Sequence, residues 1–190
     1  MYQKYYTDAL VLRSRESGEA DRIYMLYTKD FGLVRARASA VRLERSRMRY
    51  ALQNYSHTYV ALVRGKQGWR IAGASATGGV WEVSRGTPTF ARITELLLRL
   101  VTGEEENAYL FAALADAHKA LMDKGHKEYA TIEIVCVARI LYALGYLSPE
   151  ALESALFTHT AYTGEYLREA EMLREKLLSR INSAIAEAQL

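Results

Sequence analysis

Leu33-Val34-Arg35-Ala36-Arg37-Ala38-Ser39 alternates between small or apolar side chains and arginines. Strict alternation is typical of a β-strand that turns one face to a core and the other to solvent. The stretch therefore predicts a strand with a packed inner face and a cationic outer face.

Four neighbouring runs also have strand character, being rich in β-branched and aromatic residues. They cover residues 9–13, 22–28, 55–64 and 69–74, and two of the intervening segments, 29–32 and 65–68, end in glycine. Five short antiparallel strands in such a short stretch are typical of a small β-barrel, and an OB-type barrel is the natural candidate.

The sequence after residue 86 is poor in glycine and rich in Ala, Leu and Glu, which predicts helices. Thr87-Pro88 and Ser148-Pro149 resemble helix starts, with a capping hydroxyl before a proline. The acidic run Glu104-Glu105-Glu106 suits another helix N-terminus. The helices are expected over residues 88–102, 104–123, 127–144, 150–157 and 165–188. The predicted fold is α+β: an OB-type barrel over residues 1–86 and an all-α domain over residues 87–190.

Composition excludes several protein classes. The 190 residues are 50% hydrophobic and 25% charged, as in a globular protein with ample core. A single cysteine, Cys136, rules out an internal disulfide and a thiolate zinc cluster. No apolar run reaches the length of a membrane-spanning helix, and the first residues do not resemble a signal peptide. A cytoplasmic, nucleoid-associated protein without membrane contact is expected.

Charge is distributed unevenly. Residues 1–90 hold 15 Lys and Arg against 7 Asp and Glu, a net charge of +8, whereas residues 91–190 hold 10 against 15, a net charge of −5. This asymmetry indicates a basic module for a polyanion joined to an acidic module with another role.

The segment from Arg35 to Arg49 is the strongest candidate site. It holds six arginines and one acid, Glu44. Guanidinium groups bind phosphates in a bidentate manner, and nearby aromatic rings can stack on bases. The alternative is a solvated basic loop. The candidate DNA-binding residues are Arg13, Arg35, Arg37, Arg42, Arg45, Arg47, Arg49, Tyr50, Lys66, Trp69 and Arg70.

Catalytic and cofactor sites are not indicated. Asp116 and His118 are two residues apart on a predicted helix and so point in different directions. The four histidines are scattered and are expected to be surface or capping residues, and Cys136 is expected to be a buried small hydrophobe. No catalytic residue, metal site or cofactor is predicted.

Residues 8–74 resemble the family of the bacterial recombination mediator and DNA repair protein RecO. The resemblance rests on Ala9-Leu10-Val11-Leu12-Arg13, Gly18-Glu19-Ala20-Asp21-Arg22, Tyr27-Thr28-Lys29-Asp30-Phe31-Gly32 and Arg49-Tyr50-Ala51-Leu52-Gln53, with Leu144-Gly145-Tyr146 as a later marker. It implies an OB-fold followed by a helical domain, binding of single- and double-stranded DNA, strand annealing, and partnership with RecR and the single-strand binding protein.

Two features depart from that family. Many members carry a zinc-binding cysteine cluster soon after the Leu-Gly-Tyr helix, where this sequence has Ser148-Pro149-Glu150. The chain is also short for the family.

The interpretation that follows is a DNA repair and recombination mediator that is not an enzyme and that promotes strand annealing and recombinase loading. Tyr142, Tyr146 and Leu147 lie where a predicted helix meets a loop and are candidates to contact a partner such as the tail of a single-strand binding protein. Two alternatives are an RNA-binding OB-fold protein and a basic protein–protein adaptor.

Overall fold

A computed structural model of the chain describes residues 3–77, 84–123, 128–148 and 155–188. The chain divides into two units. The first comprises Met1–Val83 and Val101–Asn107, and the second comprises Ser84–Leu100 and Ala108–Leu190. Each unit has its own core, so each is described by itself.

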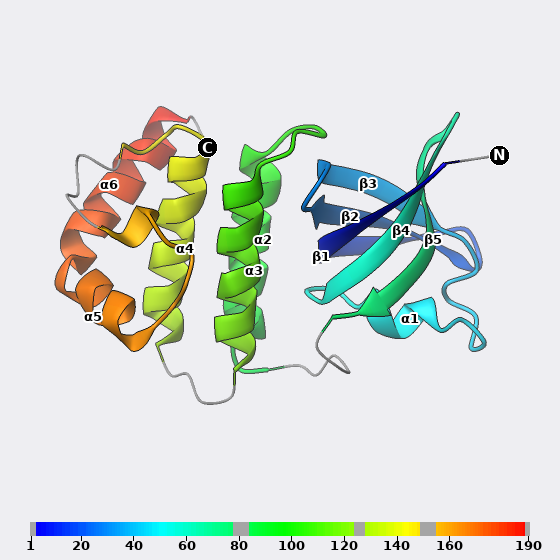
Figure 1. Ribbon diagram of the computed structural model, residues 1–190, viewed down its shortest axis with the longest axis horizontal. Helices are drawn as coiled ribbons and strands as arrows, with labels where there is room; N and C mark the ends of the chain where they lie inside the picture. Colours follow the sequence, from blue (N-terminus) through cyan, green and yellow to red (C-terminus); the bar gives the residue numbers. More distant parts are fainter. Residues whose placement is uncertain (1–2, 78–83, 124–127, 149–154, 189–190) are drawn as a thin grey trace. The chain divides into compact units, whose positions relative to one another are not determined.

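The first unit is a closed barrel of five strands (Figure 1). The strands are β1 (Lys4–Ser17), β2 (Asp21–Thr28), β3 (Gly32–Ala38), β4 (His57–Gly65) and β5 (Gly68–Ala76), and they close in the order β1-β2-β3-β5-β4. The predicted α+β class with an OB-type barrel is confirmed. One pairing, β3 with β5, is parallel rather than antiparallel. An odd number of strands cannot alternate in direction all the way around a closed ring, so one parallel pair is required.

β1 is longer than its apolar run predicted because it pairs with two neighbours. Residues 4–10 pair with β4 and residues 9–17 pair with β2, with a bulge between Val11 and Arg13. A bulge bends a strand and increases its twist, which allows β1 to serve both sides of the barrel.

The barrel core consists of the inward side chains of all five strands. Val34, Ala36 and Ala38 are buried while Arg35 and Arg37 are exposed, as the alternation predicted. A short helix that the sequence did not indicate, α1 (Met48–Ala51), begins at the end of the arginine-rich segment. Leu52, directly after it, joins the core.

The loop Val101–Asn107 packs against the barrel within the first unit. A Cβ atom built on Gly32 would clash with the carbonyl oxygen of Glu105, so only glycine allows this approach. Glu104 forms an ion pair with Arg64 at 3.4 Å. The expectation that Glu104-Glu105-Glu106 opens a helix is therefore wrong: these contacts hold the run in a loop, and the helix begins at Ala108.

The second unit is helical. Its elements are α2 (Thr87–Leu100), α3 (Ala108–Met122), α4 (Tyr129–Ala143), the 3-10 turn η2 (Ala155–Phe157), α5 (Gly164–Met172) and α6 (Arg174–Glu187). α4 contacts every other element of this unit. The helix predicted over 150–157 is described only from residue 155 onward, where the chain forms η2. Its predicted start, with Pro149, lies outside the described residues.

The helix predicted over residues 165–188 is two helices. Leu173 separates α5 from α6 with φ −94° and ψ 6°, outside helical geometry. Leu167 on α5 and Leu177 on α6 are both buried. The break lets each short helix turn its own apolar side to the core, which the periodicity alone does not reveal.

The buried polar side chains of the helical unit include Arg139 and His118. Arg139 is 0% exposed; its guanidinium donates to the carbonyl oxygens of Leu156, Thr160 and Ala161 at 2.9, 2.7 and 3.2 Å. It thereby fastens η2 and the segment after it to α4. His118 is buried edge-on against Phe90, with ring centroids 5.0 Å apart, which corrects the expectation that it is a surface or capping residue.

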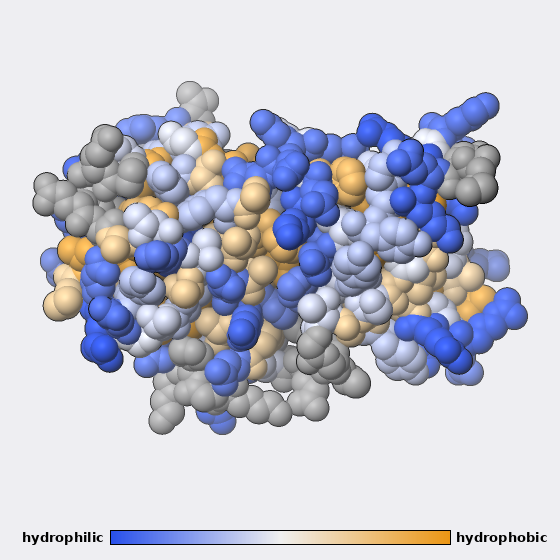
Figure 2. Space-filling view, viewed as in Figure 1, coloured by the Kyte–Doolittle hydropathy of each residue, from blue (hydrophilic) through white to orange (hydrophobic). Residues whose placement is uncertain are grey.

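No helix in the described part of the chain is both long and apolar enough to cross a bilayer. On the face shown in Figure 2, hydrophilic residues cover much of both units and hydrophobic ones surface in small patches. This pattern is ordinary for a folded domain whose apolar side chains are mostly internal.

Candidate nucleic-acid interface

Arginines from β1 and β3 align in two rows across the outer face of the barrel, and an arginine of β5 extends one of the rows. In the first row, Arg13 on β1 pairs with Met25 on β2, and Met25 pairs with Arg35 on β3. In the second row, the residues in register are Arg15 on β1, Ile23 on β2, Arg37 on β3 and Arg70 on β5. Residues opposite one another in a ladder share a face, so the five arginines form one surface, here called the arginine face: Arg13, Arg15, Arg35, Arg37 and Arg70.

The arginine face has the spacing of a regular sheet. Residues two apart on a strand are separated by about 6.6 Å, and alternate strands by about 9.6 Å. Met25 and Ile23 are partly buried between the arginines and supply an apolar floor. Extended guanidinium groups above such a floor can meet the phosphates of a nucleic-acid backbone.

A hollow of about 470 Å³ opens between β3 and β5 in this face. Its lining includes Arg35, Arg37, Arg70 and the polar side chains of Ser39 and Gln67. The hollow therefore gathers three guanidinium groups where the parallel strands meet.

Trp69 also lines this hollow, but its ring is not exposed. Only 5% of it is exposed, and its ring packs against Tyr5 and Phe31 in the barrel core at centroid distances of 5.5 and 5.3 Å. The expectation that Trp69 offers a stacking face is corrected: it alternates inward on β5, so its neighbour Arg70 points outward.

Asp21 compensates one arginine of the face. Its Oδ2 accepts from Nε of Arg37 at 2.8 Å and lies 2.6 Å from Nη2, while its Oδ1 accepts from the backbone N–H of Ala40 at 2.7 Å. The bond from Ala40 and then the one from Arg37 hold the pKa of Asp21 below its ordinary value. Among the described residues, Arg13, Arg15, Arg35 and Arg70 have no ion-pair partner.

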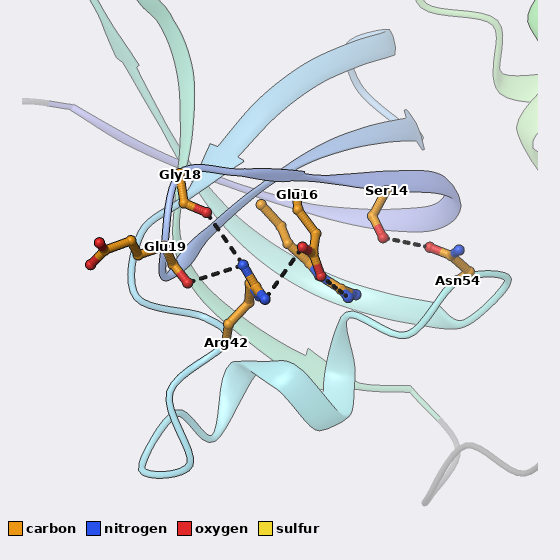
Figure 3. A network of polar contacts seen from close by, with 7 residues as sticks. Ser14, Glu16, Gly18, Glu19, Arg42 and Asn54 are labelled. Carbon is orange, nitrogen blue, oxygen red and sulfur yellow. Dashed lines mark hydrogen bonds and ion pairs between the residues drawn. The ribbon is translucent and has the colours of Figure 1, made fainter.

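Arg42 has a structural role that the sequence did not indicate (Figure 3). Its Nη1 donates to the carbonyl oxygens of Gly18 and Glu19 at 3.3 and 3.0 Å, and its Nη2 lies 3.3 Å from a carboxylate oxygen of Glu16. Its backbone N–H also donates to the carbonyl oxygen of Ala20 at 3.0 Å. Arg42 thus fastens the arginine-rich segment to the turn between β1 and β2.

The remaining predicted site residues lie in the loop before α1, in α1 itself and in the turn between β4 and β5. Arg45 and Arg47 are exposed in the loop before α1 and have no ion-pair partner within the described ranges. Arg49 lies 4.7 Å from the ring centroid of exposed Tyr50 and donates to its hydroxyl at 2.6 Å. Lys66 is exposed in the turn between β4 and β5.

Arg49 also helps to line a second hollow of about 290 Å³, together with Arg22 and Arg42. Arg22 and Arg42 share the carboxylate of Glu16, with the Arg22 contact at 3.6 Å. This hollow is therefore partly neutralised, whereas in the one between β3 and β5 the only arginine paired with a described acid is Arg37.

Sequence reasoning missed Arg15. The residues Arg13-Ser14-Arg15 repeat the alternation of β3, and this signal could have placed both arginines on one face. The predicted first strand covers only residues 9–13, so it does not include Arg15.

The candidate partner residues are mostly internal. Tyr142 packs between Tyr109 and Phe157, at centroid distances of 5.4 and 5.1 Å, and Leu147 is buried. Tyr146 is 42% exposed. Of the three, only Tyr146 presents a large surface to a partner.

The described residues contain no group of three or more His, Cys, Asp or Glu side chains arranged to hold a metal ion. Cys136 is buried, and burial raises the pKa of its thiol to about 12. Its predicted role as a small hydrophobe fits this position.

The chain is similar to known proteins over part of its length. Residues 1–77 match the family model described as "Recombination protein O N terminal". The "DNA repair protein RecO" of Desulfitobacterium hafniense is 42% identical over 62 residues, which cover 33% of this chain and 23% of that protein. The proteins of the same name from Pelotomaculum thermopropionicum and Heliobacterium modesticaldum are 32% identical over 123 residues and 45% identical over 62 residues.

These matches are partial on both sides. The Pelotomaculum match covers 62% of this chain and 47% of the relative, and the Heliobacterium match covers 33% and 23%. The matched segments thus span about half or less of the length of these curated relatives.

Proposed function

Because residues 1–77 match the family model "Recombination protein O N terminal", we propose that this barrel binds DNA through the arginine face and that the chain acts in DNA repair and recombination. The proposed ligand is the sugar-phosphate backbone of single and double strands. The proposed outcome is the annealing of complementary strands and the loading of a recombinase.

The observation that carries the proposal is the alignment of Arg13, Arg15, Arg35 and Arg70 on one face without carboxylate partners among the described residues. Like charges held at sheet spacing repel one another, which costs stability in the free protein. A polyanion removes that repulsion and releases its own counterions. The arrangement therefore favours a ligand with regularly spaced negative charges.

Annealing by this surface requires no bond chemistry. Two single strands repel each other through their phosphates, and guanidinium groups that contact both strands reduce that repulsion. Base pairing then drives duplex formation. We therefore propose a mediator and not an enzyme.

The helical unit is proposed to bind protein partners. The net charge of −5 over residues 91–190 includes three glutamates of the loop Val101–Asn107, which belongs to the barrel unit. The helical unit itself holds 11 Lys and Arg against 12 Asp and Glu, a net charge of −1, so its charge gives it no general attraction for DNA. A RecR-type mediator and the tail of a single-strand binding protein are the partners that the family resemblance implies. Tyr146 is the exposed aromatic side chain from which to begin mapping such a contact.

A salt titration tests the proposed function. Fluorescence anisotropy would measure binding of the full chain to single-stranded DNA, duplex DNA, RNA of matched sequence and an acidic peptide. If about four phosphates are engaged, the log–log slope of affinity against salt is about −3 for single strands, with little dependence on sequence. A slope near zero, or binding of the peptide alone, would instead indicate a protein adaptor. A clear preference for RNA would favour an RNA-binding function.

A further inference from the structure

Two tyrosine rings lie exposed side by side on a part of the barrel that the arginine face does not include. Tyr6 on β1 is 58% exposed and Tyr59 on β4 is 45% exposed. Their ring centroids are 6.3 Å apart and their planes differ by only 16°. By contrast, Tyr5 turns inward and contacts Phe31 and Trp69 edge-on.

The side chains in register with these rings on β4 and β5 are small. Tyr6 is in register with Ala61, which is in register with Gly73 on β5. Tyr59 is in register with Ser75 on the same strand. On the β5 side, the described residues opposite the rings are therefore too small to cover them.

Positive charge borders the pair on one side. The next row along the strands consists of Lys4 on β1, Val63 on β4 and Arg70 on β5. Arg70 is in turn in register with Arg37, so this row joins the arginine face. Tyr6 therefore lies one register step from this row, and Tyr59 lies two steps from it.

The opposite side of the pair is acidic. Asp8 is in register with Tyr59 and is partly exposed. A phosphate backbone would be repelled there and attracted to the row of Lys4 and Arg70. The charges thus favour one placement: backbone over the cations and bases over the rings.

We propose that Tyr6 and Tyr59 form a stacking platform for unpaired nucleobases of a single strand whose phosphates lie on the row of Lys4 and Arg70. Every base offers a π-face, so a platform of this kind accepts any sequence. Bases in a duplex are already stacked on one another and cannot use it. This inference rests on the proposed DNA-binding function and adds to it a site that discriminates single strands from duplexes.

The competing explanation is that the two rings only stabilise the sheet as a cross-strand pair. The two explanations differ in which nucleic-acid probe loses affinity when the rings are removed. The test therefore compares a single-stranded oligonucleotide, an abasic oligonucleotide of the same length and a duplex, all with the full chain. The variants are Y6A/Y59A, which lacks both rings, and Y6F/Y59F, which keeps them.

If the platform exists, Y6A/Y59A binds the single strand about 10-fold more weakly than the unmodified protein, and Y6F/Y59F retains its affinity. The salt slope and the affinity for the abasic and duplex probes stay unchanged, because these report phosphate contacts. Unchanged single-strand affinity in Y6A/Y59A would overturn the platform. An equal loss for all three probes would overturn it as well.

A second measurement does not depend on the alanine variant folding. The fluorescence of 2-aminopurine in an oligonucleotide is quenched when this base stacks on an aromatic ring. Binding to the unmodified protein should therefore quench the fluorescence, and binding to Y6L/Y59L should not. Equal quenching by both proteins would count against the platform.

The double variant R13A/R35A separates the two proposals, because it should lose affinity for all three probes. If it does so while the tyrosine variants change nothing, the DNA-binding function stands and the platform falls; if the unmodified protein binds no probe, both fall.

Discussion

Asp21, at the start of β2, binds Arg37 of β3 through one carboxylate oxygen and the backbone of Ala40 through the other, at 2.8 and 2.7 Å. Ala40 has a positive φ of 55°, a conformation that is unfavourable for a residue with a Cβ atom. One carboxylate thus orients an arginine of the arginine face. It also supports the strained turn that follows β3 within the arginine-rich segment.

This arrangement predicts a pH-dependent effect of Asp21→Asn. The pKa of Asp21 is lowered in the folded protein, so its stabilising contribution is present above its ordinary pKa of 3.8 and is lost as the pH falls through the lower folded value. The variant should therefore have a lower Tm than the unmodified protein at pH 7, and the difference should shrink in acid. Thermal unfolding followed by circular dichroism at several pH values measures this. A Tm difference independent of pH would contradict the role of the carboxylate charge.

The arginine face predicts how the salt dependence of DNA binding responds to substitution. Replacing Arg13 and Arg15 by alanine should weaken binding to all sequences. The salt slope for a single strand should become shallower by about 0.7 for each phosphate that these side chains no longer neutralise. Both side chains are exposed, so the fold should persist.

Arg180→Ala is the matched control for this experiment. Arg180 is also exposed but lies on α6 of the helical unit. Its replacement should leave both affinity and slope unchanged. If it weakens binding as much as the double variant does, general charge and not the arginine face is responsible.

The arginines of the loop should separate into binding and structural groups. Replacing Arg45, Arg47 and Arg49 together by alanine should reduce DNA affinity and leave the fold intact. Arg42→Ala should instead lower the free energy of unfolding by about 1 kcal/mol, because the carbonyl oxygens of Gly18 and Glu19 lose their donor. Chemical denaturation and anisotropy on both variants distinguish the groups. A triple variant that binds as the unmodified protein does would reduce this part of the loop to a solvated segment.

Arg139 is expected to be critical for the helical unit. Arg139→Met would remove the donor for three backbone carbonyls and should lower the free energy of unfolding by about 3 kcal/mol or more. Denaturant unfolding measures the effect, with Arg180→Met as the exposed control. Equal stability of the two variants would mean that water satisfies these carbonyls as well as the guanidinium does.

Cys136 should be unreactive in the folded protein. Burial raises the pKa of its thiol to about 12, so at pH 8 only about one thiol in ten thousand is ionised. A thiol reagent should therefore label the native protein far more slowly than the denatured protein. Rapid labelling under native conditions would show that α4 opens readily.

The sequence by itself determined where most of the strands and helices form and which side chains of β3 face outward. The alternation around Arg35 and Arg37 placed arginines on an outer face, since successive side chains of a strand point to opposite sides. Thr87-Pro88 marked the start of α2, because a proline needs no backbone donor in the first turn. These features depend only on neighbours in the sequence, so they are readable without the fold.

Other features were decided only by the pairing of distant strands. Barrel closure aligned Arg15 with Arg37 and Arg70, turned Trp69 into the core and left Tyr6 and Tyr59 outside. The same aromatic residue types therefore have opposite roles according to the direction each position faces.

The loop after α2 and the break at Leu173 also depended on tertiary contacts. Glu104 and Glu105 suit a helix start by charge, but the ion pair with Arg64 and the approach to Gly32 hold them in a loop. The apolar period through Leu173 suits one long helix, yet two helices bury Leu167 and Leu177. In each case the local preference is worth a fraction of a kilocalorie per residue, and packing against distant residues outweighs it.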